Sequence, residues 1–259
     1  MSQCKVQGVA RKRMVVLVIG FVSLSGHARV SHNDSCILRD SQTQLMSRNR
    51  SNAIRCGSLE TDCRTITSPW GNEDTQTLID ILAKYGVKTT FFVVGDWVDK
   101  YPESVKALHE AGHEIMNHSN THAHYNSLTT DEIIADVNAC NDKIAAITGV
   151  RPTLIRCPYG EYDDHVIAAI RSIGMEPIQW DVDSLDWKDL SGAEITKRVT
   201  GKVQSGSICL FHNAALHTPE ALPSILEYFK NNGYTVVPIS KILLEGEYYM
   251  DHTGKQCRE

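Results

Sequence analysis

The chain has 259 residues, of which 42% are hydrophobic and 22% are charged, and its formal net charge is −5. These values are typical of a soluble globular protein and exclude a wholly disordered, a collagen-like or a polytopic membrane protein. The acidic balance provides no basic surface, so we expect no nucleic-acid partner. The eight cysteines never form a CxxC pair, which argues against a zinc ribbon or a thioredoxin-type motif.

The N-terminus has the pattern of an export signal. Basic residues precede an apolar run from Met14 to Leu24, and small residues up to Ala28 resemble a signal-peptidase site. The run is too short to span a bilayer comfortably. We therefore expect a signal peptide or anchor over residues 1–28, an extracellular or cell-envelope location, and membrane contact only through this segment. A buried strand is the alternative interpretation of the run.

Two regions follow this segment. Residues 29–68 are rich in Ser, Arg, Asn, Thr and Cys without helical or strand periodicity, which predicts a linker or a poorly ordered arm. From Trp70 onward, predicted strands alternate with predicted helices of about 10–15 residues, as in βαβ units. With one further strand expected before Trp70, six or seven such units favour a (β/α) barrel over an open sheet. The expected helices lie near 74–85, 102–112, 133–147, 165–173, 193–203 and 222–231, and the expected strands near 89–94, 113–116, 153–156, 177–182, 207–211 and 235–238.

Polar residues cluster after several predicted strands, where barrel enzymes carry their chemistry. His118 and His122 are four residues apart in one such loop and could converge on a single divalent metal ion. The pattern alone is weak, and a loop of solvated histidines is its more common explanation. His212 ends a buried apolar strand, which is more often structural than catalytic unless an acid is placed to tune it.

Two further strand-end segments contain residues suited to a binding site. Arg156 opens the sequence Arg-Cys-Pro-Tyr-Gly and could orient a carboxylate, although an ordinary strand-to-helix turn also explains the proline and glycine. The segment from Trp180 to Trp187 holds three carboxylates between two indole rings. This composition suits a sugar site, and a solvated acidic loop with core tryptophans is the alternative.

The order of these motifs resembles that of the polysaccharide deacetylases of carbohydrate esterase family 4, the NodB homology domain. Four of the family's five motifs occur in order between about Trp70 and Leu243. Segments such as WGNEDTQTLIDIL and KTTFFVVGDWVDKYPE are similar to the sporulation-associated bacterial branch. The resemblance implies a distorted (β/α)7 barrel over residues 69–246 with a tail at 247–259. It also implies metal-dependent hydrolysis of N-acetyl groups on a cell-wall polysaccharide or a chitin-like oligosaccharide.

The resemblance assigns roles to individual residues. His212 would be the general acid for the leaving amine, Asp186 would tune it, and Arg156 would hold the catalytic base. The implied metal ion, which is zinc, cobalt or manganese, would be bound by His118 and His122. The residues implied to contact substrate are Tyr159 through its backbone N–H, and Trp180 and Leu210 around the acetyl methyl group.

The family's first motif is missing. It is a strand that ends in Phe-Asp, and the matching position three residues before Trp70 is Thr67, which cannot serve as a base near neutral pH. Asp74 is the best remaining candidate for the third metal ligand. Either the chain is a catalytically impaired glycan-binding relative, or the residues before about Pro69 come from a shifted reading frame. The second hypothesis also accounts for the arginine-rich arm and its cysteines, and we favour it slightly. GlcNAc and MurNAc substrates remain equally open.

Overall fold

The computed structural model describes residues 13–21, 71–251 and 254–257, and the structural statements below concern these residues. Eight strands form one sheet in the order β5-β4-β3-β2-β1-β7-β6, with β8 paired to β1, and every pairing in it is parallel. The strands are β1 (Arg13–Phe21), β2 (Thr90–Val93), β3 (Glu114–Asn117), β4 (Leu154–Ile155), β5 (Glu176–Pro177), β6 (Val182–Asp183), β7 (Ile208–His212) and β8 (Tyr234–Val236).

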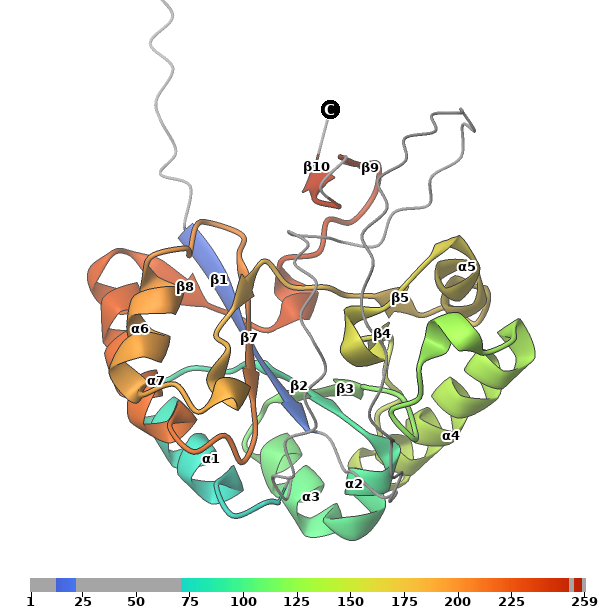
Figure 1. Ribbon diagram of the computed structural model, residues 1–259, viewed down its shortest axis with the longest axis horizontal. Helices are drawn as coiled ribbons and strands as arrows, with labels where there is room; N and C mark the ends of the chain where they lie inside the picture. Colours follow the sequence, from blue (N-terminus) through green and yellow to red (C-terminus); the bar gives the residue numbers. More distant parts are fainter. Residues whose placement is uncertain (1–12, 22–70, 252–253, 258–259) are drawn as a thin grey trace, which may run out of the picture.

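Seven helices of the described part of the chain surround this sheet, as expected for parallel strands joined by crossover helices. They are α1 (Thr75–Lys84), α2 (Gly95–Lys100), α3 (Pro102–Glu110), α4 (Thr130–Thr148), α5 (Asp164–Ser172), α6 (Gly192–Thr200) and α7 (Thr218–Asn231). Figure 1 shows them following one another around the outside of the strands in the order α6, α7, α1, α3, α2, α4, α5. The predicted distorted (β/α)7 barrel is confirmed, with β5 and β6 as the two unpaired ends of the strand order within the described part of the chain.

The first strand lies where the export signal was expected. The run from Met14 to Leu24 was interpreted as the hydrophobic part of a signal peptide, whereas the structure places Arg13–Phe21 as strand β1 between β2 and β7. A parallel strand that is buried on both faces is a continuous apolar run, just like a signal sequence, so the pattern alone could not separate the two. The barrel therefore includes a strand outside the predicted domain boundaries of 69–246. Residues 22–70, which include the whole predicted arm and Thr67, lie outside the described residues.

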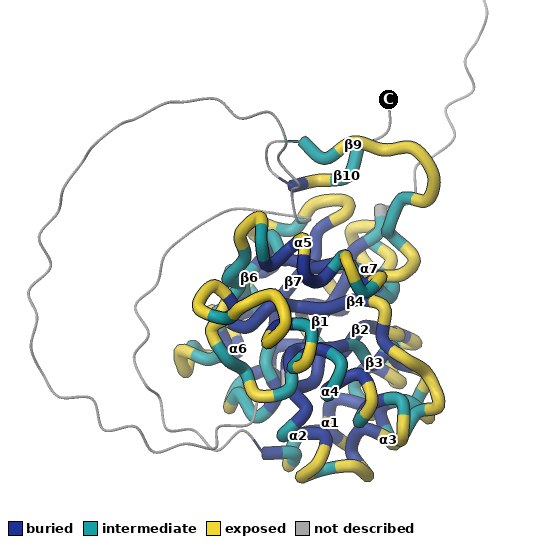
Figure 2. The backbone as a smooth tube through the Cα atoms, turned by 90° about the vertical axis from the view of Figure 1, so that its right-hand side faces the viewer, coloured by how far each residue is buried: buried dark blue, intermediate teal, exposed yellow. Residues whose placement is uncertain are grey.

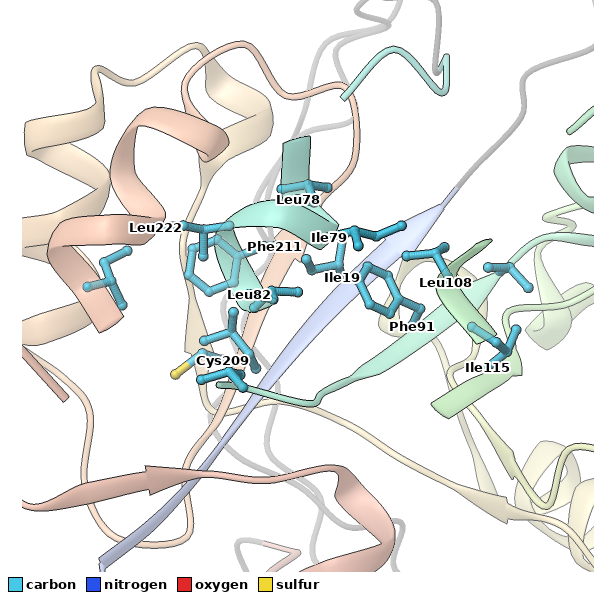
Figure 3. Close-up of a cluster of buried hydrophobic side chains, with 14 of the residues drawn as sticks. Ile19, Leu78, Ile79, Leu82, Phe91, Leu108, Ile115, Cys209, Phe211 and Leu222 are labelled. Atoms are coloured by element: carbon cyan, nitrogen blue, oxygen red, sulfur yellow. The ribbon is translucent and has the colours of Figure 1, made fainter. Parts of the chain in front are cut away.

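The hydrophobic core is built around β1. The side chains of Val15 to Ile19 are fully buried, and each such burial stabilises the fold by about 1.5–3 kcal/mol. Side chains from α1, α3 and α7 pack against β1, β2 and β7 on one side, as the labelled residues of Figure 3 show. Figure 2 shows the same arrangement along the backbone, with buried strands inside and exposed loops outside. Removing β1 would therefore remove the centre of the core.

The other elements agree with the sequence in order and differ in detail. The capping box of Thr129 and Glu132 is present and begins α4. Helix α2 was not predicted, because its six residues are too few for a periodic pattern. The predicted strand at 177–182 forms two short strands, β5 and β6, and α7 begins at Thr218, four residues earlier than expected. The predicted tail contains a small antiparallel hairpin of β9 (Tyr249–Met250) and β10 (Gln256–Cys257). No helix in the described ranges has the length and hydropathy needed to cross a membrane.

Candidate functional site

The predicted site residues lie at one edge of the sheet. Parallel strands end at a common edge, and His118, Arg156 and His212 lie at or directly after the ends of β3, β4 and β7. Strand pairing brings them into register, because Asn117 is opposite Ile155 and Gly20 is opposite His212. The fold therefore gathers segments that are nearly 100 residues apart in sequence.

His118 and His122 face each other with their ring centroids 5.0 Å apart. His118 is buried, and its Nδ1 lies 2.7 Å from the carbonyl oxygen of Arg156. A carbonyl only accepts hydrogen bonds, so Nδ1 carries the proton and Nε2 keeps its lone pair. Burial and the neighbouring charge of His122 lower the pKa of His118 well below its ordinary value, and burial with the charges of His124 and His212 lowers the pKa of His122 to about 4. Both rings are therefore neutral near pH 7, as metal binding requires.

Asp136 on α4 holds the loop between the two histidines. Its Oδ2 accepts hydrogen bonds from the backbone N–H of Asn120 and the hydroxyl of Tyr125, both at 2.8 Å. Its Oδ1 accepts from the hydroxyl of Thr121 at 2.9 Å. The loop needs such support because the backbone of His122 has a positive φ of 57°. Asp136 was not predicted, although an acid on the apolar stripe of a helix is a signal for a buried polar role.

His212 is partly buried and forms a pair with the fully buried side chain of Asp186. Nδ1 of His212 lies 2.7 Å from Oδ1 of Asp186, and the His212 backbone N–H donates to Oδ2 at 2.7 Å. The hydroxyl of Thr218 donates to Oδ2 at 2.6 Å. Burial alone would raise the pKa of Asp186, but the charge of His212 and these hydrogen bonds lower it below its ordinary value. The pair thus has the contacts of an acid that orients a histidine, and Thr218 is a member that the sequence did not reveal.

Asp74 lies next to the loop that follows β7. Its Oδ2 accepts the backbone N–H of Ala214 at 2.8 Å, and its Oδ1 is buried with no hydrogen-bond partner among the described residues. Burial, reinforced by the charges of Glu73 and Asp186, raises the pKa of Asp74 to about 6. Asp74 is thus in electrostatic contact with the His212–Asp186 pair.

Asn213 joins two distant parts of the chain at this edge. Its backbone N–H donates to the carbonyl of Gly20 at the end of β1, at 3.1 Å. Its side-chain amide donates to the carbonyl of Gly71 at 2.7 Å. One residue next to His212 therefore holds both β1 and the segment leading into α1.

Arg156 is buried without a carboxylate bound to its side chain. It is 2% exposed, and none of its three guanidinium nitrogens has a hydrogen-bond partner in the described part of the chain. The guanidinium carbon lies 4.6 Å from the ring centroid of Phe92 and 5.3 Å from that of Trp180. Burial lowers the pKa of Arg156 to about 9, and the charge of Asp183 opposes this shift.

Tyr159 has a left-handed backbone, with φ 57°, and the residue is 47% exposed. The ring stacks on His124 at a centroid distance of 4.0 Å and meets the ring of His122 at 4.5 Å. A β-carbon on Gly160, the next residue, would lie 2.8 Å from the Trp180 ring, so a glycine is needed there. Tyr159 is therefore brought together with the histidine pair, whereas Trp180 lies beside Arg156.

Leu210 was predicted to line the same pocket as Trp180. It is buried in β7, two residues before His212, and strand alternation puts both side chains on one face of the sheet. It therefore lies on the His212 side of the site.

The described residues fit a metal ion in part. Two neutral imidazoles close together are suitable zinc, cobalt or manganese ligands, and the hydrogen bond from His118 to a backbone carbonyl is the usual support for a ligating histidine. His122 also has a buried Nδ1 without a hydrogen-bond partner. However, within the described ranges no three His, Cys, Asp or Glu side chains gather as one metal-binding group.

Several known proteins are similar to this chain in sequence and in fold. A family model described as polysaccharide deacetylase matches residues 63–178. The chain is 34% identical over 168 residues to the peptidoglycan-N-acetylmuramic acid deacetylase PdaC of Bacillus subtilis, a match that covers 65% of this chain and 35% of PdaC. It is 33% identical over 186 residues to the peptidoglycan-N-acetylglucosamine deacetylase PgdA of Listeria monocytogenes, covering 70% and 39%. The chain contains a polysaccharide deacetylase domain. It spans between about a third and a little over half of the length of these relatives and of YlxY from Bacillus subtilis.

A solved structure adds a further comparison within the family. A carbohydrate esterase family 4 pseudoenzyme from Bacillus anthracis is 28% identical, with a TM-score of 0.68, over 92% of this chain and 68% of that chain. A mutant of that protein with restored enzymatic activity has a TM-score of 0.69, over 92% and 70%. Carbohydrate esterase family 4 thus includes a pseudoenzyme with a similar fold, and a mutant of that protein has restored enzymatic activity.

The place of the missing base can now be located in the sequence. The family motif resembled above is a strand followed at once by an acid, and β1 ends at Phe21. The next two residues in the sequence are Val22 and Ser23, and neither is acidic. The strand end therefore places the motif position at Val22, whereas the spacing to Trp70 places it at Thr67, and neither residue is an aspartate.

Proposed function

We propose that the chain is a metal-dependent hydrolase that removes N-acetyl groups from GlcNAc or MurNAc units of peptidoglycan or a chitin-like polysaccharide, outside the cell or in its envelope. The observation that supports this best is the His212–Asp186 pair at the same sheet edge as the His118–His122 pair. A general acid next to a metal-binding pair is the combination that amide hydrolysis requires. The family relatives named as peptidoglycan deacetylases support the substrate class.

In this proposal the residues divide the work between proton transfer and binding. His118 and His122 would hold the ion, with Asp74 as the proposed third ligand because its buried Oδ1 has no described partner. A bound divalent ion would polarise the acetamide carbonyl and lower the pKa of a water molecule. His212 would give its Nε2 proton to the leaving amine, because Asp186 holds the Nδ1 proton and fixes the ring orientation.

The remaining residues would position the acetyl group. The backbone N–H of Tyr159 would donate to the developing oxyanion, and Trp180 and Leu210 would pack against the acetyl methyl. Arg156 would orient the base of this reaction, a role for which the described residues offer no carboxylate partner. These assignments follow the family pattern onto matching positions of this chain.

A second candidate function is glycan binding without catalysis. Two observations favour it, namely the absence of an acid directly after β1 in the sequence and the buried Arg156 without a carboxylate. The fold's similarity to a family 4 pseudoenzyme is consistent with it. His118, His122 and the exposed Tyr159 would then bind a glycan without taking part in catalysis.

One set of measurements on the full chain separates the two candidates. Bound zinc, cobalt and manganese are measured, together with acetate release from chitooligosaccharides and muropeptides and with retention on insoluble peptidoglycan. A deacetylase releases acetate, and the His212→Asn variant loses this release while it keeps its metal. Metal binding and glycan retention without acetate release would establish the second candidate instead. A chain that shows none of these would refute both.

A further inference from the structure

The buried guanidinium of Arg156 is an unsatisfied cation inside the barrel. Its side chain is 2% exposed, and Nε, Nη1 and Nη2 all lack hydrogen-bond partners among the described residues. Buried charges in proteins are normally paired, because removing an ion from water without compensation is strongly unfavourable. Arg156 is the one described arginine with all three nitrogens in this state. A bound anion would compensate this buried charge.

The aromatic neighbours stabilise the charge but leave its donors unused. Phe92 and Trp180 have ring centroids 4.6 and 5.3 Å from the guanidinium carbon. Ring faces attract a cation through their π electrons, whereas the five N–H bonds of a guanidinium lie in its plane and point at a planar acceptor. Such a fork is matched by the two oxygens of a carboxylate.

The carboxylate whose charge acts most strongly on Arg156 does not accept a hydrogen bond from its guanidinium group. Asp183 is the group whose charge most favours the charged form of Arg156. However, Oδ1 of Asp183 accepts the backbone N–H of Leu185 at 2.8 Å, in the turn that leads to Asp186. No hydrogen bond joins Asp183 to Arg156 in the described structure. The acceptor must therefore come from elsewhere.

We infer that Arg156, walled by Phe92 and Trp180, forms a binding site for a small monocarboxylate from solution. The ligand is small because the guanidinium nitrogens are buried and Phe92 is fully buried. Trp180 is only partly buried and is the side chain past which such an anion enters. The inference concerns binding alone, so it does not depend on the deacetylase activity proposed above.

Formate is the probe, with chloride at the same ionic strength as the reference. A ligand that binds only the folded state raises the midpoint of thermal unfolding. We expect formate to raise the Tm of the full chain by at least about 2 °C over chloride when it is well above its dissociation constant. The single proton of formate also allows direct detection of binding by saturation-transfer NMR.

Two variants make the test specific. Arg156→Met removes the charge and keeps the volume, and we expect it to lose both the formate shift and the NMR signal. It should also unfold at an equal or higher temperature than the wild type in chloride, because an unpaired buried charge has been removed. Arg151→Met is the matched control, since Arg151 is half-exposed and paired with Asp142, and it should keep the full formate response.

Three results would overturn the inference. The first is a formate response no larger than that of chloride. The second is an equal formate response in Arg156→Met. The third is a large loss of thermal stability in Arg156→Met in chloride, which would mean that the chain itself satisfies the guanidinium. Should Arg156→Met fail to fold, Arg156→Lys replaces it, and an undiminished formate response in that variant would likewise count against a bidentate site.

Discussion

His118 and Arg156 are joined by a hydrogen bond of 2.7 Å between the imidazole Nδ1 and the Arg156 carbonyl oxygen. The bond spans the ends of β3 and β4, which are paired at Asn117 and Ile155. Because it fixes the Nδ1–H tautomer, it leaves the lone pair of Nε2, the atom of His118 that we propose binds the metal ion. The same bond places the proposed metal-binding histidines next to the buried arginine, so two of the predicted motifs meet at one point of the backbone.

The first prediction concerns metal retention. His118→Ala should reduce bound zinc to background, because it removes one of the two histidines proposed to hold the ion, and the described residues gather no other group of three ligands that could replace it. Metal content is measured on purified protein after dialysis. His124→Ala is the matched control, since the His124 side chain is 57% exposed and stacks on Tyr159. Unchanged metal content in His118→Ala, or equal loss in both variants, would contradict the assignment.

The second prediction concerns the loop between the histidines. Asp136→Ala removes the acceptor of three hydrogen bonds, from Asn120, Tyr125 and Thr121. We expect zinc affinity to fall about 10- to 100-fold, the usual effect of losing a group that orients metal ligands. Asp136→Asn, which keeps one acceptor oxygen, should recover part of this loss.

The control for this experiment lies on the same helix. Asp142→Ala removes another α4 acid, which pairs with Arg151 at the surface, and should leave zinc affinity within about twofold. A merely structural role for Asp136 would lower the Tm and leave the zinc affinity of the folded fraction unchanged. Titration with zinc at a temperature well below the transition therefore decides between the two.

The third prediction concerns the support of Asp186. Thr218 is fully buried and donates to Oδ2 of Asp186 at 2.6 Å. Thr218→Val keeps the shape and removes the donor, so a buried carboxylate loses a hydrogen bond at a cost of about 1–3 kcal/mol in unfolding free energy. Thr218→Ser keeps the donor and should cost less than half as much. Denaturant unfolding measures both, and a loss in Thr218→Ser as large as that in Thr218→Val would contradict a dominant role for the hydroxyl.

The sequence located the site better than it located the fold's first strand. Strand-end motifs such as those around His118 and His212 could be placed because parallel strands necessarily end at a common edge. The run from Met14 to Leu24 could not be placed, since burial on both faces removes the alternation that identifies a strand. Its central position became visible only through pairing with β2 and β7.

Contacts between residues far apart in the chain could not be predicted from the sequence either. Asp136 and Thr218 act through hydrogen bonds to loops that no spacing rule connects to them. Asn213 donates hydrogen bonds to the carbonyl groups of both Gly20 and Gly71, which are far apart in the sequence. The sequence shows that the acid expected to pair with Arg156 is missing. It does not show that the Arg156 side chain is buried without a hydrogen-bond partner among the described residues.

The fourth prediction concerns Gly160, which lies beside the Trp180 ring. Its φ is +68°, and an added β-carbon would lie 2.8 Å from the ring. Gly160→Ala should destabilise the protein by about 2–3 kcal/mol, from backbone strain and from displacement of Trp180. Gly149→Ala is the control, because Gly149 has a similar φ of +72° with nothing within 4 Å, so it reports the backbone cost of about 1 kcal/mol alone. Equal losses in denaturant unfolding would show that the Trp180 contact is not rigid.

The fifth prediction concerns acid stability and arises away from the site, at His113. His113 is 4% exposed, and its Nδ1 accepts the backbone N–H of Thr89 at 3.2 Å, which requires the neutral ring. Burial, with the charge of Lys88, lowers the pKa of His113 from 6.5 to about 4. Between these two values the unfolded chain binds the proton and the folded chain does not, so stability is present above pH 6.5 and is lost as the pH falls toward 4.

This shift predicts a loss of about 2 kcal/mol in unfolding free energy from His113 alone between pH 7 and pH 5. His113→Gln keeps an acceptor and cannot titrate, so its stability should fall by about 2 kcal/mol less than that of the wild type over the same range. Denaturant unfolding at the two pH values measures the difference. His109→Gln, at a half-buried position on α3, is the control and should follow the wild type. Parallel pH profiles for wild type and His113→Gln would show that the ring is protonated in the folded protein.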